Sequence, residues 1–370
     1  MNEYITKDLA MQEKNEKIDF EIIVNELKEK YHPKKSDSLK HMRWALELGL
    51  ISEKRALGSL DSSGNQHGGI ENCGKKLKFA LNRDKTKRYM YDARFCRWRF
   101  CPMCNWRLSL KRGFVNAVVM KRLAKLGYRF IFVTLTIPNV AKDELGNTIA
   151  ELGAGWQRLI KRKKYKDFIV GGIRNVEVTY NKKRDDYHPH LHVICCVKPE
   201  YFKCVRVGSG SDRERIYPNM IDFETWQKDW QSAIKNPRAE QIWVKAVSQS
   251  ERLFHKAALE ISKYVVKDSD MGESPDVFEG FVKGLKGKRL FNPFGVMSEL
   301  HNEFLKHPED FHDCFNPRQP EDWFWKYIAR WNFKENIYEN GFFELTDEEI
   351  IKVQKKFSGN LKKEDLEDRD

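Results

Sequence analysis

The sequence predicts an α+β fold in which helices pack on one face of a mostly antiparallel sheet. Two observations lead to this fold class. Strand and helix signals alternate through the middle of the chain in the order β-α-β-β-α-β-α, and two long strands are separated only by the polar tip 182–186. Strands joined by so short a connection pair antiparallel, and helices between strands cover a sheet. With 370 residues, of which 41% are hydrophobic, the chain can bury a core.

The elements of this middle region follow from local pattern. Residues 130–137 are rich in β-branched side chains, which favours a strand. The helical pattern at 144–164 is weakened by Gly153 and Gly155. The expected elements are strands at 130–137, 169–181, 188–197 and 242–247, and helices at 111–126, 144–164, 220–235 and 252–267.

Composition divides the chain into four regions. We expect a helical N-terminal region at 1–60, a linker and cysteine-rich segment at 61–110, a catalytic domain at 111–280, and a basic, aromatic and helical region at 281–370 that ends in an acidic tail.

Charge and hydropathy exclude several classes of protein. Lys and Arg exceed Asp and Glu by 67 to 54, which gives a net charge of +13 and favours phosphate-rich partners. The most apolar stretch, 130–137, is far shorter than the roughly 20 residues that cross a bilayer. The N-terminus lacks the pattern of a secretory signal, so we expect a cytoplasmic protein.

Four of the eight cysteines predict a structural zinc site. Cys96, Cys101 and Cys104 have the spacing C-x4-C-x2-C, and Cys73 precedes them. Reduced cysteines in such a cluster are typical of a tetrahedral zinc site. The alternative is a set of isolated buried thiols. Cys195 and Cys196 are adjacent on a strand and point to opposite faces, which indicates packing.

A second metal site is predicted on the strand that contains His190 and His192. Residues i and i+2 of a strand share a face, so the two imidazoles can hold one divalent cation, Mg²⁺ or Mn²⁺. Glu177 on the preceding strand is brought beside them if the chain closes at 182–186. The alternative is a pair of strand histidines satisfied by hydrogen bonds.

A third pattern combines Glu260, Tyr264 and Lys267. On the expected helix, the spacings of four and three place these side chains on one face. A phenol becomes a useful nucleophile when nearby charge stabilises its anion, and a carboxylate can take a proton from water. The alternative is an ordinary amphipathic helix.

Basic clusters near aromatic residues favour binding to nucleic acid. Each cluster alone also fits a solvated face. The DNA-binding candidates are Lys161, Arg162, Lys163, Lys164, Lys182, Lys183, Arg184, Lys263, Lys286, Lys288 and Arg289.

Together these motifs resemble the replication initiator (Rep) proteins of small bacterial rolling-circle plasmids, in the HUH endonuclease superfamily. The segment 132–140 is similar to the first family motif, 188–193 to the metal motif and 260–270 to the nucleophile motif. The closest similarity is to the branch with one tyrosine, a glutamate and a cysteine-rich motif. The resemblance implies the HUH fold, which is ferredoxin- or RRM-like, with a zinc knuckle and helical extensions at both ends.

The resemblance also implies an activity. Tyr264 attacks a phosphate at a single-stranded nick site in a hairpin of the double-strand origin, which leaves a 5′-phosphotyrosine and a free 3′-OH primer. Lys267 steadies the transition state, and Glu260 activates water for the terminating cleavage before strand joining. A host helicase and a replicative polymerase are the implied protein partners, and a homodimer is left open.

Two other functions remain as alternatives. One is a transposase or mobilisation relaxase with the same tyrosine chemistry. The other is a non-catalytic zinc-containing DNA-binding regulator. Under that function it is hard to explain why the chain contains all of His190, His192, Glu260, Tyr264 and Lys267.

Overall fold

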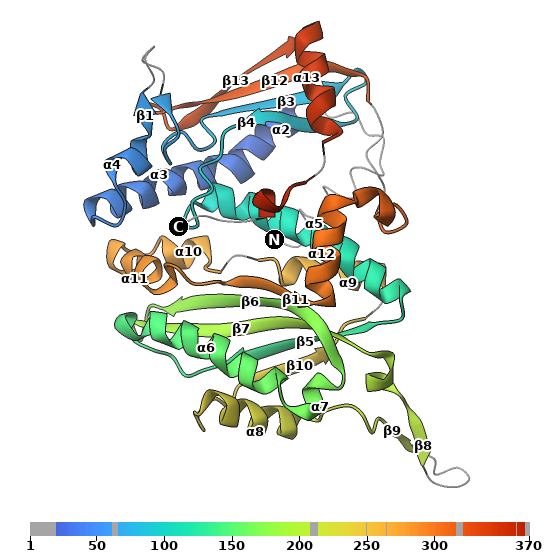
Figure 1. Cartoon of the computed structure of the whole chain (residues 1–370). Helices are drawn as coiled ribbons and strands as arrows, with labels where there is room; N and C mark the ends of the chain where they lie inside the picture. The colour runs from blue at the N-terminus through green and yellow to red at the C-terminus, as the bar shows by residue number, and fades with distance from the viewer. Residues whose placement is uncertain are drawn as a thin grey trace. The chain divides into compact units, whose positions relative to one another are not determined.

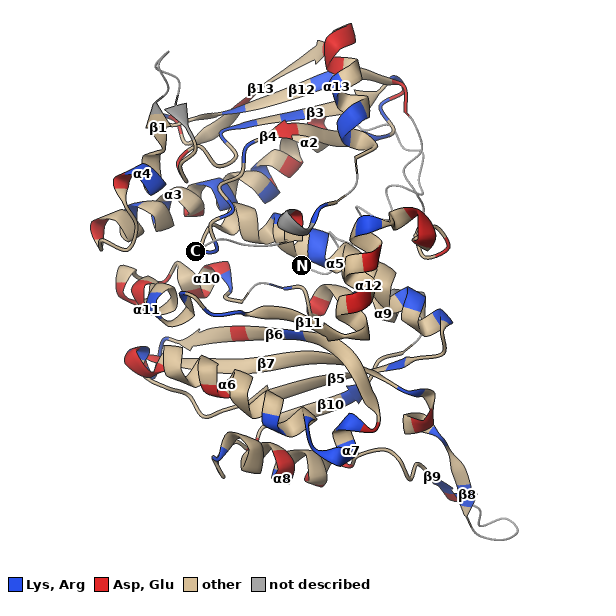
Figure 2. Cartoon of the chain, in the orientation of Figure 1, with Lys and Arg blue, Asp and Glu red and all other residues tan. Residues whose placement is uncertain are grey.

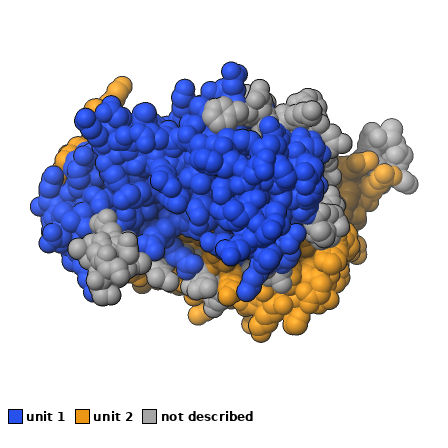
Figure 3. Space-filling model, turned by 90° about the horizontal axis from the view of Figure 1, so that it is seen from above, with its two compact units in different colours: residues 1–105, 317–361, 369 blue, residues 106–316, 362–368, 370 orange. Residues whose placement is uncertain are grey.

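The chain divides into two units, which are described separately (Figures 1 and 3). The computed structural model describes residues 20–60, 66–207, 214–248, 250–263, 265–315, 321–359 and 361–366. Unit 1 comprises 1–105, 317–361 and residue 369, and unit 2 comprises 106–316, 362–368 and residue 370. In sequence, unit 2 is therefore inserted between the two main segments of unit 1.

Unit 2 is built on a five-stranded antiparallel sheet with the strand order β10-β5-β7-β6-β11. The hairpin β6–β7 closes at the expected polar tip. The α+β class and the antiparallel pairing predicted from the sequence are confirmed. The strands are β5 (Arg129–Thr136), β6 (Ile169–Asn181), β7 (Asp186–Val197), β10 (Ile242–Ala246) and β11 (Phe291–Gly295).

Helices cover both faces of this sheet, so the expectation of helices on one face is wrong. Trp230 of α8 donates from Nε1 to the carbonyl of Thr136 on one side. On the other side, the ring of Phe254 in α9 lies 5.5 Å from that of Phe130. Phe130 is buried, so apolar side chains on this second face also need a covering helix.

The helices of unit 2 vary from one turn to several. They are α5 (Pro102–Lys125, which begins at the end of unit 1), α6 (Leu145–Ile160), α7 (Lys163–Lys166), α8 (Phe223–Ile234), α9 (Glu251–Glu260), α10 (Asp268–Met271), α11 (Pro275–Leu285) and α12 (Val296–Lys306). No helix among the described residues has both the length and the hydropathy to cross a membrane.

Unit 1 contains a four-stranded antiparallel sheet with the order β13-β12-β3-β4. Tyr31 packs edge-on against Phe79 of β3, with ring centroids 6.0 Å apart. The elements of the unit are α2 (Phe20–Glu26), a π-helical turn (Leu27–Tyr31), α3 (His32–Glu47), α4 (Glu53–Leu57), β1 (Ser59–Leu60), β2 (Gln66–His67), β3 (Lys76–Asn82), β4 (Arg88–Ala93), β12 (Trp323–Asn332), β13 (Ile337–Glu344) and α13 (Asp347–Phe357).

The expectation of a helical C-terminal region is wrong for residues 323–344, which form β12 and β13. Along β12 the buried positions recur every second residue from Tyr327 through Ala329 to Trp331. This period of two places those side chains on one face of the sheet. Aromatic residues fit a half-buried pleated surface, and β3 supplies the hydrogen-bonding partner.

Candidate metal centres

Three side chains from neighbouring strands converge on one face of the unit 2 sheet. Glu177 of β6 lies directly opposite His190 of β7, and His192 lies opposite Asn175 and Thr134. Alternation along each strand puts these side chains on the same face. The sequence-based expectation that the hairpin brings Glu177 beside the two histidines is met by this register.

The ligand atoms of this triad are close enough to share one cation. Oε2 of Glu177 lies 3.1 Å from Nε2 of His192 and 3.6 Å from Nε2 of His190. All three donor atoms lie within 4.8 Å of one another. The side chains of Glu177 and His192 are 15% and 16% exposed, so a ligand can reach the triad from solvent.

The surroundings of the triad orient it for a metal ion. Nδ1 of His190 donates to the carbonyl of His188 at 3.2 Å, and Nδ1 of His192 is 3.0 Å from Oγ1 of Thr134. These bonds leave both Nε2 atoms facing Glu177, which is the arrangement of metal-binding histidines. Burial raises the pKa of Glu177, but hydrogen bonds from the histidines and their charges hold it well below its ordinary value. Two imidazoles and a carboxylate fit a divalent cation with open positions.

The segment that contains the expected nucleophile is not one helix. Helix α9 ends at Glu260 and α10 begins at Asp268, so the expectation of a helix over 252–267 is wrong beyond Glu260. The cause is competition from β6. Nδ2 of Asn175 donates to the carbonyl of Lys263 at 3.1 Å, and the amide of Val178 donates to the carbonyl of Val265 at 2.7 Å. Tyr264 itself lies outside the described residues.

Glu260 and Lys267 lie on either side of this segment. Because α9 stops between them, the structure does not place them on one helical face. Oε1 of Glu260 is 2.6 Å from Nζ of Lys263, and both side chains are substantially exposed. Lys267 is exposed and precedes the first turn of α10.

The four predicted cysteines come together in unit 1. Sγ of Cys73 lies 3.6 Å from Sγ of Cys101 and 3.5 Å from Sγ of Cys104, and Cys96 and Cys104 are 3.6 Å apart. Four sulfurs at about 2.3 Å from zinc in a tetrahedron are separated by about 3.8 Å. Burial raises the pKa of the Cys101 thiol, but hydrogen bonds from its neighbours outweigh this and lower it. The cluster fits a zinc ion.

Lys35 beside this cluster was not singled out from the sequence. It is fully buried, and its Nζ donates to the carbonyls of Glu71 at 2.5 Å and Cys73 at 2.8 Å. Burial lowers the pKa of Lys35, and the charges of the thiolates of Cys73, Cys101 and Cys96 oppose this shift. Nothing in its helix distinguishes it from the other basic residues. Asn175 was also missed, although its spacing of two from Glu177 places it on the triad's face.

The predicted basic residues divide into paired and unpaired groups. Arg162 and Lys164 both pair with Asp229, Lys182 with Glu273, Arg184 with Asp186, and Lys263 with Glu260. Figure 2 shows that basic and acidic residues are interspersed along unit 2. The others have no ion pair with any acidic residue in the described part of the chain: Lys161, Lys163, Lys183, Lys286, Lys288 and Arg289.

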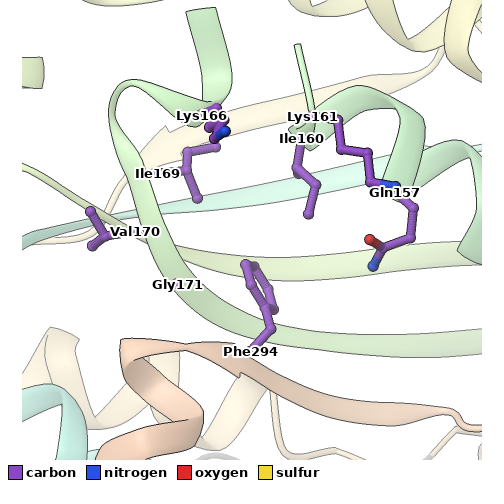
Figure 4. Close-up of a pocket in the computed structure, with 8 residues that line it drawn as sticks. All are labelled: Gln157, Ile160, Lys161, Lys166, Ile169, Val170, Gly171 and Phe294. Atoms are coloured by element: carbon purple, nitrogen blue, oxygen red, sulfur yellow. The ribbon is translucent and has the colours of Figure 1, made fainter. Parts of the chain in front are cut away.

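A cleft of about 550 Å³ lies beside Lys161 and Lys166 (Figure 4). Phe294 forms part of its wall and is paired with Gly172 of β6. Gly172 and Glu177 are five positions apart on one strand, so they face opposite sides of the sheet. The cleft is therefore not part of the triad site.

Comparison with known proteins gives one consistent result. The family model described as "Replication protein" matches residues 87–339. The chain is 33% identical over 234 residues to Protein rep of Streptococcus pneumoniae serotype 2, a match that covers 62% of this chain and 69% of that protein. It is 37% identical over 207 residues to Protein rep of Staphylococcus aureus, with coverages of 56% and 84%.

A longer match extends over more of the chain. Protein rep of Lactiplantibacillus plantarum is 26% identical over 327 residues, which are 84% of this chain and 95% of that protein. No solved structure matches the chain.

Proposed function

Since the chain belongs to the replication protein (Rep) family, we propose that it starts plasmid rolling-circle replication by nicking one strand of the double-strand origin. Family membership confirms the resemblance drawn from the motifs. It also favours replication over the transposase or relaxase alternative. The further proposal concerns the chemistry, the residues that perform it and the HUH type of fold in unit 2.

One observation carries the proposal: strand β6 contributes Glu177 to the triad and also binds the residues on either side of position 264. Asn175 and Val178, which bind the carbonyls of Lys263 and Val265, flank Glu177 on that strand. The two residues next to Tyr264 in sequence are therefore anchored on either side of Glu177. This anchoring supports Tyr264 as the group that meets a phosphate held at the triad.

The proposed reaction is a transesterification. The phenol oxygen of Tyr264 forms a bond to the scissile phosphorus, and the bond from phosphorus to the 3′ oxygen breaks. The 3′ oxygen takes up a proton and becomes the primer terminus. Glu177, His190 and His192 would hold a divalent cation, Mg²⁺ or Mn²⁺, which as a Lewis acid lowers the charge on the phosphate oxygens. Lys267 contributes positive charge near the developing anion.

Glu260 is proposed as the base of the terminating cleavage. Its carboxylate is solvent-accessible and pairs with Lys263, and a carboxylate can accept a proton from water. Joining then occurs when a 3′-OH attacks the phosphotyrosine and releases the phenol. Zinc at the four cysteines is proposed to be structural.

Another tyrosine near the triad in sequence is a poorer nucleophile. Tyr180 is three residues from Glu177 on β6 and so faces the opposite side of the sheet. A hydrogen bond from its hydroxyl to Asp185 raises the pKa of Tyr180 to about 12. Tyr180 is therefore a suitable control.

The test is a covalent-adduct assay. Purified protein is incubated with Mn²⁺ and labelled single-stranded oligonucleotides that tile the cognate origin, and the products are separated on a denaturing gel. We expect an adduct with the wild type and with Tyr180→Phe, and none with Tyr264→Phe. An adduct with Tyr264→Phe would show that another residue is the nucleophile. Duplex origin binding without an adduct from any protein would favour the non-catalytic regulator.

The proposed function also implies which molecules the protein binds. They are the origin duplex with its hairpin, a host helicase and a replicative polymerase. The basic side chains without ion pairs, such as Lys183 at the hairpin tip and Lys286 after α11, are the proposed contacts to DNA phosphates.

A further inference from the structure

A short β-ribbon in unit 2 has no role in the site described above. It consists of β8 (Val205–Val207) and β9 (Glu214–Ile216), which pair with each other and with no third strand among the described residues. All six residues of the two strands are exposed. Figure 1 shows the ribbon as an arm that extends away from α8. A two-stranded ribbon without a covering element is marginally stable in water.

The register of the ribbon places two arginines directly opposite each other. Arg206 pairs with Arg215, between the pairs Val205–Ile216 and Val207–Glu214. Side chains of residues directly opposite each other on paired strands point to the same face, so both arginines lie on one face of the ribbon. Neither arginine makes an ion pair with an acidic side chain in the described ranges.

Like charges directly opposite each other weaken a strand pair. A hairpin with only a structural role gains nothing from such a pair. An anionic partner on that face would offset the repulsion between the two arginines. Each guanidinium can bind phosphate or a base edge with two hydrogen bonds. The arginine pair therefore points to a ligand with closely spaced negative charge.

Duplex DNA has the matching dimensions and charge. Its major groove is about 12 Å wide and admits a two-stranded β-ribbon, whose strands are about 4.8 Å apart. Arginine is also the side chain most often used to read guanine in that groove. The net charge of +13 attracts the same partner.

We propose that the β8–β9 ribbon enters the major groove of duplex DNA, with Arg206 and Arg215 facing phosphates and base edges. This inference rests on the proposed function, because an initiator must hold its origin as a duplex before nicking. It assigns that duplex contact to a surface separate from the triad.

The decisive variant is Arg206→Glu. It places a carboxylate opposite Arg215, so the ribbon itself gains a cross-strand ion pair. If the arginines act only in the fold, the melting temperature is equal or higher and DNA affinity is unchanged. Under our proposal, the melting temperature is equal or higher while affinity for duplex DNA falls about tenfold or more at low salt.

The control is Arg238→Glu, at an exposed position after α8 in the same unit, which makes the same change in charge. Binding of a labelled duplex of the cognate origin is followed by fluorescence anisotropy across a NaCl series. The double variant Arg206→Gln/Arg215→Gln is expected to reduce the slope of log affinity against log salt by about 2. An equal loss of affinity in Arg238→Glu, or none in Arg206→Glu, overturns the proposal.

The same proteins are tested for the covalent adduct on single-stranded DNA. We expect Arg206→Glu to form the adduct as the wild type does, because the ribbon is not part of the triad site. If the wild type forms no adduct but the ribbon variant alone loses duplex affinity, the nicking proposal fails and the ribbon proposal stands. If adducts form and duplex affinity is unchanged in Arg206→Glu, only the ribbon proposal fails.

Discussion

At the scale of single residues, Lys35 links the fold of unit 1 to its cysteine cluster. A zinc ion with four thiolates carries a net negative charge, and a buried ammonium group nearby offsets part of it. Lys35 also satisfies two buried carbonyls, those of Glu71 and Cys73. Both effects depend on a positive charge at this one position.

We therefore expect Lys35→Met to destabilise the protein by about 1–3 kcal/mol, the cost of leaving buried polar groups unpaired. It should also lose zinc faster to a chromogenic chelator. Thermal unfolding and the rate of zinc release are the measurements. Lys40→Met, a change at a half-buried lysine that pairs with Asp37 on the same helix, is the control. Equal zinc retention in both variants would contradict the role of Lys35.

His301 of α12 predicts a dependence of stability on pH. It is 6% exposed, and its Nε2 has no hydrogen-bond partner among the described residues. Burial lowers the pKa of His301 from 6.5 to about 4. Between these two pKa values the unfolded chain binds more protons than the folded one. The contribution of His301 to the free energy of unfolding is therefore fully present above pH 6.5 and is lost as the pH falls towards 4.

The shift corresponds to about 3 kcal/mol lost over that range. We expect His301→Leu to remove this part of the loss. The free energy of unfolding of the variant, compared with that of the wild type, should therefore be higher at pH 5 than at pH 7. Urea unfolding of both proteins at the two pH values measures the difference. The same pH dependence in both proteins would mean that other groups cause it.

At the scale of elements, helix α6 contains two glycines with different surroundings. A methyl group on Gly155 would lie 2.8 Å from Cδ1 of Ile234 and 3.2 Å from the ring of Trp230, both in α8. A methyl group on Gly153 would meet only the guanidinium end of the long Arg174 side chain, at 3.1 Å. The close approach of α6 to α8 therefore requires glycine at 155 and not at 153.

We expect Gly155→Ala to destabilise unit 2 by about 1–3 kcal/mol through overpacking. Gly153→Ala should be neutral or stabilising by up to about 1 kcal/mol, because alanine is the better helix former. Thermal unfolding of the two variants makes a matched comparison. Equal effects would show that α6 and α8 are not packed as described.

Elements also show what the sequence could and could not predict. The strands and the register of the triad follow from local alternation and a short polar turn. The end of α9 does not, because its cause is a bond from Asn175, far away in sequence. Strands β12 and β13 were missed because their aromatic residues read equally well as helical, and their partner β3 lies at the other end of the chain. Two facing arginines in a ribbon appear only once the register is known.

At the scale of the whole molecule, the C-terminal strands support the cysteine cluster. The amide of Trp331 donates to the carbonyl of Lys75 at 2.8 Å, and the hydroxyl of Tyr338 donates to the carbonyl of Gly74 at 2.7 Å. Both acceptors directly follow Cys73. The position of this cysteine therefore depends on residues from the opposite end of the chain.

We expect a chain ended at residue 316 to retain less than one zinc per molecule, although it keeps all four cysteines. The milder variant Tyr338→Phe should bind zinc but release it faster than the wild type. Tyr89→Phe, which removes a hydroxyl bonded to Lys356, is the control. Metal analysis of the purified proteins and chelator kinetics are the measurements, and full zinc content in the shortened chain would contradict this dependence.

The insertion of unit 2 between β4 and β12 also sets an order of events on the ribosome. Strand β3 leaves the ribosome early, but its partner β12 is synthesised only after the whole of unit 2. Domains generally fold as units while the chain is still growing. A nascent chain can therefore complete the sheet that contains the triad while β3 and the nearby thiols still lack their partner strands. Closure of the unit 1 sheet therefore follows the synthesis of unit 2.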